Sequence, residues 1–598
     1  MDNIERIYQE KLDEHTQRML RIKKQSKQLA WSRLAVFVTG ITLSILTFKI
    51  DLYLFSSILV VAIVAFAVLL KLFNRKSLAI KLQEQYIQLN KNELLALKGD
   101  YSCFDPGNEY TDRLHPYTFD LDIFGEGSIF NAINRTTTIN GKKELAQQLE
   151  TPLKNITLIN DTQKSITELK EKLEWRQKFQ AYGNLYEEHQ EDISNVKEWL
   201  EEPVVFMKMK AYRIIAHIFA ALTILCVLAS SFGHISSTTT LYAVLIEVLI
   251  LLIPLRKVNE KHRRVSKVLA VLQNYKDLLS IIEKEQFESK NINAFKNGLK
   301  SDDQAAAQSI AQLTKLIDAL DNRMNAIAGI LLNLFLLWDL RHMIKLEHWK
   351  MQHKEQVLSW FSILGKIDAL ASLACFAFNH PSFIMPNPIS NVKVLEAKNL
   401  GHPLLNDKER VDNDFEIAKK GGFVIITGPN MAGKSTFLRT AGVNLILAMA
   451  GAPVCATKFE FALVDLFSSM RTSDSLQKGE SYFYAELKRL QTIVENLKEN
   501  KNLFVILDEI LKGTNSKDKE KGSKAFMKQM IELGGTGIIA THDLSLCEIE
   551  KDFPDHIRNQ SFEVEIEGKK IHFDYLLRDG ITTKMNATFL MEQMGIIN

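Results

Sequence analysis

The segment FVIITGPNMAGKST, Phe423 to Thr436, predicts a buried strand, a glycine-rich loop and, from Thr436, a helix. Its β-branched apolar start suits a strand inside a sheet. The loop matches the phosphate-binding pattern GxxxxGK[ST] in the strand–loop–helix setting that this pattern requires. The loop residues are Gly428, Pro429, Asn430, Met431, Ala432, Gly433, Lys434 and Ser435. We therefore expect an α/β P-loop domain in the C-terminal third of the chain.

The chemistry of this loop indicates a site for ATP and Mg²⁺. The two glycines let backbone amides point at phosphate oxygens, and the helix start adds the positive end of its dipole. Lys434 is expected to neutralise the β and γ phosphates, so it is both a binding and a catalytic candidate. The Ser435 hydroxyl is expected to bind Mg²⁺.

Two further strand-like runs end in residues that complete such a site. Leu503 to Leu507 is followed by Asp508 and Glu509. Asp508 is expected to hold the magnesium shell, and Glu509 to orient or deprotonate the attacking water. Gly537 to Ala540 leads into His542, a candidate sensor of the γ-phosphate. A histidine after a strand is more often structural, but the neighbouring motifs favour the sensor.

Four apolar runs predict two membrane-spanning hairpins, at 34–48, 52–70, 214–232 and 238–255. Runs of about 18 apolar residues are long enough to span, and the first, which is shorter, would need tilt or a thinner bilayer. The alternative is buried core helices of a soluble protein. Basic residues flank both pairs on one side, and the positive-inside rule makes that side cytoplasmic. These residues are Arg18, Arg21, Lys23, Lys24, Lys27, Arg33, Lys71, Arg75, Lys76, Lys81, Lys208, Lys210, Arg213, Arg256, Lys257, Lys261, Arg263 and Arg264.

We therefore expect an integral protein of the inner or cytoplasmic membrane, with the P-loop domain in the cytoplasm. Glu247 lies inside the fourth run, where an ionised carboxylate is costly, and no partner is evident from the sequence.

The net charge of +3 does not by itself indicate nucleic acid. Five scattered cysteines without a CxxC pair predict neither disulfides nor a zinc site. Ile310, Leu313, Ile317 and Leu320 form a helical packing stripe, and 341–378 continues as a long helical pattern.

Several motifs together resemble one family. Asn430-Met431 is distinctive among P-loops, and Ser473 to Leu476, with Gly479, Ser481, Phe483 and Glu486, forms a second signature before Asp508. With Gly513 to Ser516 and Thr541-His542, these motifs resemble the ATPase of the MutS mismatch-repair family. Asp120 to Thr137 and Asp368 to Ser372 are similar to its core and lever helices. Leu511 and Lys512 depart from its usual Gly-Arg, Tyr482 replaces a small Thr, and its mismatch-reading domain is not recognised in this sequence.

The resemblance implies a homodimer with ATP held between two subunits. Ser481 of one subunit would touch the γ-phosphate in the neighbouring site, and Thr436 would complete the nucleotide contacts of the loop. The expected parts are an N-terminal helix with the first hairpin (1–99), a MutS-like core segment (100–210), the second hairpin (211–257), a helical core and lever region (258–395) and the MutS-like ATPase domain (396–598).

The favoured function is a membrane-anchored, dimeric ATPase that acts on or near double-stranded DNA, as in repair of mismatches. A non-DNA mechanochemical ATPase acting on a membrane complex is the first alternative. An ABC-type transporter is less favoured, because the predicted spans form two separated pairs and no LSGGQ-like run precedes Asp508.

Overall fold

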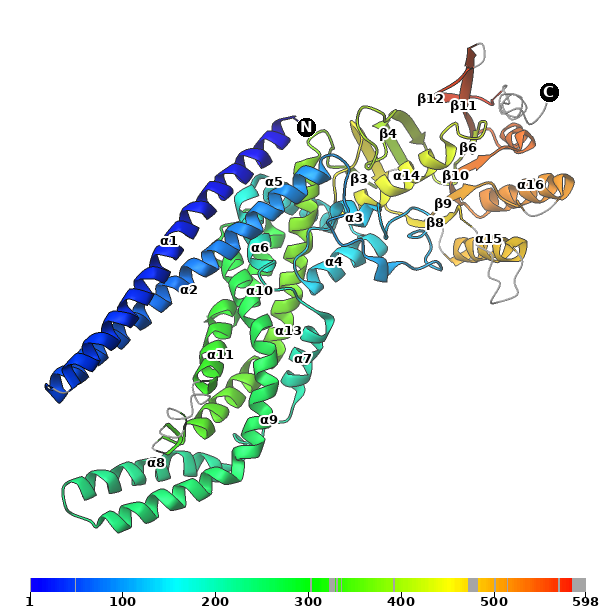
Figure 1. Cartoon of the computed structure of the whole chain (residues 1–598). Coiled ribbons are helices and arrows are strands. Elements are labelled where there is room, and N and C mark those ends of the chain that lie inside the picture. Colours follow the sequence, from blue (N-terminus) through cyan, green and yellow to red (C-terminus); the bar gives the residue numbers. More distant parts are fainter. Residues whose placement is uncertain are drawn as a thin grey trace.

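The computed structural model of this chain describes residues 2–48, 50–301, 304–321, 329, 332–334, 336–390, 393–471, 482–499, 502–512, 515–567 and 570–582. Two helical hairpins extend from a helical body, and an α/β region lies at the opposite end of the molecule (Figure 1). The expected combination of a mostly helical part with a C-terminal α/β region is confirmed.

The first hairpin consists of α1 (Asp2–Phe48) and α2 (Leu52–Ala96), which pack against each other. Asp51 begins α2 as its N-cap, because its carboxylate accepts hydrogen bonds from the N–H groups of Tyr53 and Leu54. At 1.5 Å per residue each helix is about 70 Å long. The helices therefore extend well beyond the apolar runs, and their inner halves carry buried polar contacts such as His15 with Gln83 at 2.9 Å.

A buried polar cluster joins the inner end of this hairpin to the helical body. Arg135 donates from Nε to Oε1 of Glu93 on α2 at 2.6 Å. Asn379 donates to Oε2 of the same carboxylate at 2.7 Å, and the Tyr8 hydroxyl of α1 donates to Asn379 Oδ1 at 2.7 Å. Moving α2 away would leave the buried charge of Arg135 without its partner, and moving α1 away would break the hydrogen bond of Tyr8, and both changes are costly. The cluster therefore holds both hairpin helices against the body.

The body is built around α13 (Trp338–Asn379), which packs on α4, α5, α9 and α11. The predicted stripe lies on α11, where Ile310, Leu313, Ile317 and Leu320 are all fully buried. The long helix expected at 341–378 is also confirmed. The remaining elements of the body are α3 (Ile129–Ile133), α4 (Ile139–Glu150), α5 (Ile156–Glu171), α6 (Leu173–Gly183), α7 (Gln190–Glu201), α10 (Lys290–Gly298), α11 (Ala306–Asp321), β1 (Lys300–Ser301), β2 (Gln304–Ala305) and η1 (Asn108–Tyr110).

The second hairpin consists of α8 (Lys210–Ser231) and α9 (Ser237–Lys284), with Pro254 inside α9. The parts of α9 at 237–249 and 254–284 are bent by 52° relative to each other, as a proline within a helix causes. The base of this hairpin is held to α13 by Glu347. This carboxylate accepts from Lys261 Nζ at 2.7 Å and from the N–H groups of Val205 and Met207, both at 2.8 Å.

Among the described residues, three helices are long and apolar enough to cross a membrane, or four if the bent α9 counts as one span. The three are α1, α2 and α13. The apolar window of α13 is 78% buried inside the protein, whereas the windows of α1 and α2 are 11% and 0% buried. The apolar surface of α13 is thus covered by other helices, and that of the first hairpin is not.

The α/β region contains a six-stranded sheet in the order β12-β11-β6-β10-β9-β8, with all pairs parallel except the edge pair of β11 with β12. α14 covers one face, and α15 and α16 cover the other. A second sheet has the order β3-β7-β4-β5. The bounds are β3 (Asn387–Ile389), β4 (Leu395–Leu400), β5 (Asn413–Ile417), β6 (Phe423–Thr427), α14 (Lys434–Met449), β7 (Lys458–Ala462), β8 (Asp465–Ser469), α15 (Tyr482–Glu499), β9 (Leu503–Asp508), α16 (Ser516–Glu532), β10 (Thr536–Thr541), η3 (Leu544–Glu548), α17 (Ile549–Asp552), β11 (Ile557–Glu567) and β12 (Lys570–Asp579).

Candidate functional site

The carboxyl ends of three parallel strands bring the predicted site residues together. β10 lies between β6 and β9, with Thr541 opposite Thr427 and Ala540 opposite Asp508. The glycine-rich loop, the acidic pair and His542 therefore leave the sheet at one edge. The carboxyl edge of a parallel sheet is where ligands bind in open α/β folds.

Lys434 begins α14 and points back into the loop. Its Nζ donates to the carbonyl oxygens of Gly428 and Pro429 at 2.8 and 2.9 Å, and lies 3.3 Å from His542 Nε2. Burial lowers the pKa of this ammonium group, although the nearby Glu509 carboxylate acts in the opposite direction. Gly433 has a φ of 101°, which lets the loop close onto the helix.

The polar side chains opposite Lys434 form two bonded pairs. The Ser435 hydroxyl donates to Asp508 Oδ2 at 2.6 Å. His542 Nε2 and Glu509 Oε1 are 2.8 Å apart. The hydrogen bond with His542 lowers the pKa of Glu509 to about 2. The charges of His542, Lys512 and Lys434 also lower this pKa. Glu509 is therefore an ionised carboxylate at neutral pH.

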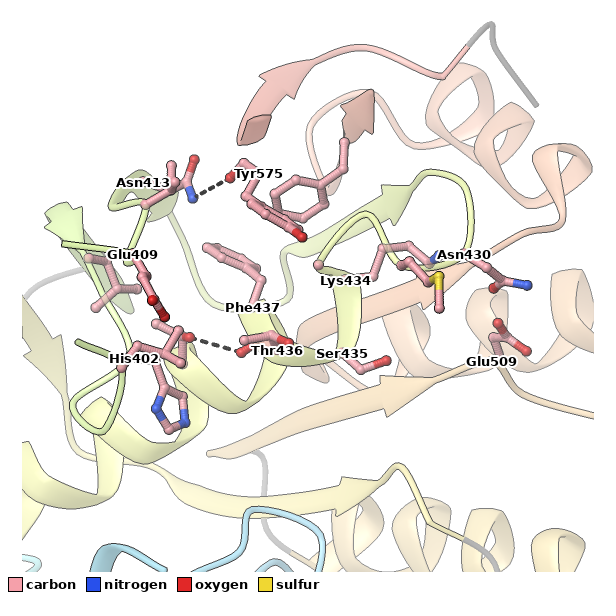
Figure 2. A pocket seen from close by; sticks show the side chains of 17 residues that line it. His402, Glu409, Asn413, Asn430, Lys434, Ser435, Thr436, Phe437, Glu509 and Tyr575 are labelled. Carbon is pink, nitrogen blue, oxygen red and sulfur yellow. Dashed lines mark hydrogen bonds between the residues drawn. The ribbon is translucent and has the colours of Figure 1, made fainter. Parts of the chain in front are cut away.

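A cavity of about 660 Å³ opens beside the loop (Figure 2). At one end are the side chains of Lys434, Ser435 and Glu509, and at the other is a largely apolar wall. Asn413 fixes part of this wall by donating from Nδ2 to the carbonyl of Tyr575 at 3.0 Å. The cavity is also lined by Leu400, His402, Leu405, Glu409, Val411, Phe437, Thr440, Phe562 and Tyr575.

This cavity has the chemistry of a nucleotide site. A charged end with a lysine and a hydroxyl–carboxylate pair suits phosphates with a divalent cation, and an aromatic and aliphatic end suits a base. Burial, followed by the charge of Arg439, lowers the pKa of His402 to about 4, so this ring is neutral at pH 7. Among the described residues no three His, Cys, Asp or Glu side chains form a metal site. Ser435 and Asp508 could hold a cation only together with phosphate oxygens.

The comparisons with known proteins concern this same part of the chain. The model of MutS domain V matches residues 424–593. The DNA mismatch repair protein MutS of Thermotoga maritima is 34% identical over 248 residues, 41% of this chain and 30% of that protein. The proteins of the same name from Persephonella marina and Fusobacterium nucleatum are 31% and 32% identical, over 39% and 37% of this chain and 27% and 25% of theirs. The C-terminal α/β region of this chain therefore carries a MutS domain V.

The MutS similarity spans less than a third of the length of these relatives. It includes Lys434, Asp508, Glu509 and His542, which all lie within the matched domain V. Loop residues and Glu509 of this MutS domain line the cavity, and Asp508 and His542 contact them through Ser435 and Glu509. Asn430, Met431 and Thr436 are exposed and line it, whereas Pro429 and Ala432 are buried and do not line it.

Two groups of residues differ from the set that the sequence predicted: one lies outside the described part of the chain, and the other lines the cavity without having been predicted. Ser481 and the rest of 472–481 lie outside the described residues. Glu409, Phe437 and Tyr575 line the cavity but were not selected from the sequence. Nearby, Gly401 to Leu404 and Asn413-Asp414 resemble the entry to the MutS ATPase domain, but this resemblance does not indicate a binding site.

Proposed function

We propose that this chain is a membrane-anchored MutS-type ATPase that binds Mg²⁺·ATP in the cavity beside the glycine-rich loop and hydrolyses it. One observation carries the proposal. Lys434, the Ser435–Asp508 pair and the Glu509–His542 pair follow three adjacent strand ends, and Lys434, Ser435 and Glu509 of this group line one cavity. These are the groups that phosphoryl transfer requires: a cation for the phosphates, ligands for magnesium and a base for water.

Each of these residues has a defined part in the proposed reaction. Lys434 exchanges its two carbonyl partners for phosphate oxygens, and the N-terminus of α14 adds backbone donors. Ser435 and Asp508 would hold magnesium, which would neutralise charge on the phosphates. Glu509 takes a proton from water as the water oxygen bonds to the γ-phosphorus and the bond to ADP breaks. His542 holds the Glu509 carboxylate through its 2.8 Å contact.

The far end of the cavity fits the base of the nucleotide. Tyr575 offers an aromatic face and Phe437 offers apolar contact. Base stacking on an aromatic ring and burial against aliphatic groups are the usual means of holding adenine. Tyr575 comes from β12, so this strand is part of the proposed nucleotide site although it lies at the edge of the sheet.

We also propose that two copies of the chain form each complete site. Ser481, which by resemblance contacts the γ-phosphate of the neighbouring subunit, directly precedes α15 in the sequence. Tyr484 and Leu487 of this helix are 56% and 39% exposed, so α15 presents large apolar side chains at its surface. Such side chains are typical of interfaces between subunits.

Membrane anchoring through both hairpins is supported by the distribution of side chains. Trp31 and Tyr53, near the two ends of the apolar part of the first hairpin, are 64% and 85% exposed, as expected for aromatic residues at membrane interfaces. In the second hairpin, the buried Glu247 of α9 faces Thr223 of α8. A carboxyl group that is turned toward the partner helix is compatible with lipid around the hairpin.

The central test is ATP turnover by the purified chain in detergent or nanodiscs. Glu509→Gln should still bind ATP but turn over at least ~100-fold more slowly, because it lacks the base. Lys434→Ala should lose nucleotide binding, because it removes the cation that faces the phosphates. Glu495→Gln, an exposed change on α15, is the matched control for the first variant and should behave as wild type. Near-normal turnover by Glu509→Gln would exclude this residue as the base.

The relatives are named DNA mismatch repair proteins, and we propose duplex DNA as the second ligand of this chain. The same turnover assay with and without duplex DNA compares this proposal with the alternative, an ATPase that moves a membrane complex. Stimulation by DNA supports the first function. Turnover that is indifferent to DNA, together with no DNA binding at low salt, supports the second.

A further inference from the structure

The turn after β9, which carries Glu509, has an unusual backbone conformation. Glu509 and Leu511 have φ angles of 52° and 59°, in the left-handed region that residues with side chains rarely adopt. Such a conformation persists only where surrounding groups hold it, and it is common at functional sites. The position of the Glu509 carboxylate therefore depends on what holds the turn.

Glu486, in the first part of α15, holds this turn from the far side. Its Oε1 accepts a hydrogen bond from the N–H of Leu511 at 2.6 Å, and its Oε2 accepts one from the N–H of Lys512 at 3.1 Å. The Glu486 side chain is buried. Burial raises the pKa of this carboxyl group, and the two N–H donors act in the opposite direction. The carboxylate thus bridges α15 and the turn without touching the nucleotide cavity.

Other contacts of the described turn residues include Lys512 Nζ, which lies 3.8 Å from Glu509 Oε2, and the packing of Ile510 and Leu511 in the core. Glu509 itself donates from its N–H to the carbonyl of Ala540 at 2.9 Å, which fixes only the start of the turn. The Leu511 side chain packs on Gly522 of α16. α15 is in turn anchored to the sheet, because Arg489 donates from Nε to the Ser468 carbonyl at 2.9 Å. The Glu486 carboxylate is therefore presented from a fixed helix.

We propose that Glu486 is a positioning residue for hydrolysis: it holds the left-handed turn so that the Glu509 carboxylate stays beside His542 and faces the cavity. The inference rests on the proposed ATPase function. It also links α15, which directly follows Ser481 in the sequence, to the catalytic carboxylate. A shift of α15 would move the turn, and with it Glu509.

A double-mutant cycle of Glu486→Ala and Glu509→Gln tests this role in the full-length chain. Glu486→Ala alone should lower kcat by ~10- to 100-fold with KM within about threefold of wild type, because misplacing a catalytic group costs turnover and not binding. In the Glu509→Gln background the same change should cost almost nothing further, because Glu486 acts only through Glu509. Glu486→Gln, which keeps one acceptor oxygen, should retain more activity than Glu486→Ala.

The controls separate positioning from a general role in folding. Glu495→Ala, on the exposed side of the same helix, should leave kcat and KM unchanged. If Glu486→Ala does not fold, Glu486→Gln takes its place in the cycle. Additive losses in the cycle, or an unchanged kcat, would overturn the inference while leaving the ATPase function intact. Absence of turnover in the wild type would instead overturn the proposed function, and the inference with it.

Discussion

Asp368 carries a fully buried carboxyl group on α13, close to the start of α4. Its Oδ2 accepts hydrogen bonds from the N–H groups of Thr137 and Thr138 at 3.0 and 2.9 Å, and from the Thr138 hydroxyl at 2.8 Å. Burial raises its pKa to about 7, and the charge of Glu188 acts in the same direction. In the unfolded chain an aspartate has a pKa of about 3.9.

This difference predicts a pH dependence of stability. The folded chain keeps a proton on Asp368 that the unfolded chain releases above about pH 4. The contribution of this proton to the free energy of unfolding is therefore full below about pH 4 and is lost as the pH rises through about 7. Between about pH 5.5 and about pH 8, the free energy of unfolding of wild type should fall by about 2 kcal/mol more than that of Asp368→Asn. Urea midpoints in one detergent measure this, with the exposed Asp555→Asn as control. Equal pH slopes in all three proteins would contradict the prediction.

At the scale of single residues, the sequence pointed to the end of the cavity with Lys434, Ser435 and Glu509, and did not point to Glu409, Phe437 or Tyr575. Lys434 and Ser435 belong to one continuous motif, and Asp508 follows an obvious strand. Tyr575 reaches the cavity from β12, and its place depends on the order of strands in the sheet. Glu409 comes from the loop before β5. Neither position carries a local pattern that indicates a ligand.

At the scale of elements, apolar runs located the hairpin helices but not their ends. The run at 238–255 stops near Leu255, whereas α9 continues to Lys284. A helix satisfies its own backbone hydrogen bonds in water as well as in lipid, so a change from apolar to polar residues marks a change of surroundings and not the end of the helix. α13 shows that an apolar helix need not face lipid: it is long and apolar enough to span a membrane, but its apolar surface is buried by neighbouring helices.

The two-hairpin topology predicts which side chains are reachable from outside the cell. In a variant with Cys103 and Cys226 replaced by serine, His234→Cys should react with a membrane-impermeant thiol reagent in intact cells. His234 is exposed in the link between α8 and α9. Ser77→Cys, which lies on α2 beyond the apolar run, should react only after the cells are permeabilised. Labelling of Ser77→Cys in intact cells would show that the first hairpin does not have this orientation.

At the scale of the whole molecule, the proposed composite site predicts that two defective subunits can complement each other. Lys434→Ala removes the phosphate contact of a subunit's own site, and Ser481→Ala removes the contact proposed to reach the neighbouring one. A mixed dimer should keep one intact site, so an equimolar mixture should recover part of the turnover that each variant lacks. Mixtures of wild type with inactive Glu509→Gln calibrate subunit exchange. A mixture as inactive as both parents, with exchange demonstrated, would show that sites are not shared.

The proposed DNA binding also depends on the whole molecule. The net charge of the chain is only +3, and two apolar hairpins occupy the end of the molecule opposite the α/β region (Figure 1). Basic side chains of the helical body, such as Arg341 and the exposed Lys345 on α13, are the candidate contacts. Contacts of this kind reach phosphates, which carry no sequence information. They release counterions, so binding weakens steeply as salt rises.

We therefore expect weak, salt-sensitive binding of duplex DNA, with less than about tenfold preference for a mismatch, or about 1.4 kcal/mol. Competition between matched and mismatched duplexes at two salt concentrations measures both quantities. Arg341→Gln with Lys345→Gln should lower the affinity for both duplexes equally and reduce the salt dependence, because each lost phosphate contact removes a released counterion. Lys517→Gln, an exposed change on α16, serves as the control. A strong mismatch preference would mean that this chain reads bases directly, and unchanged binding by the double variant would place the DNA on another surface.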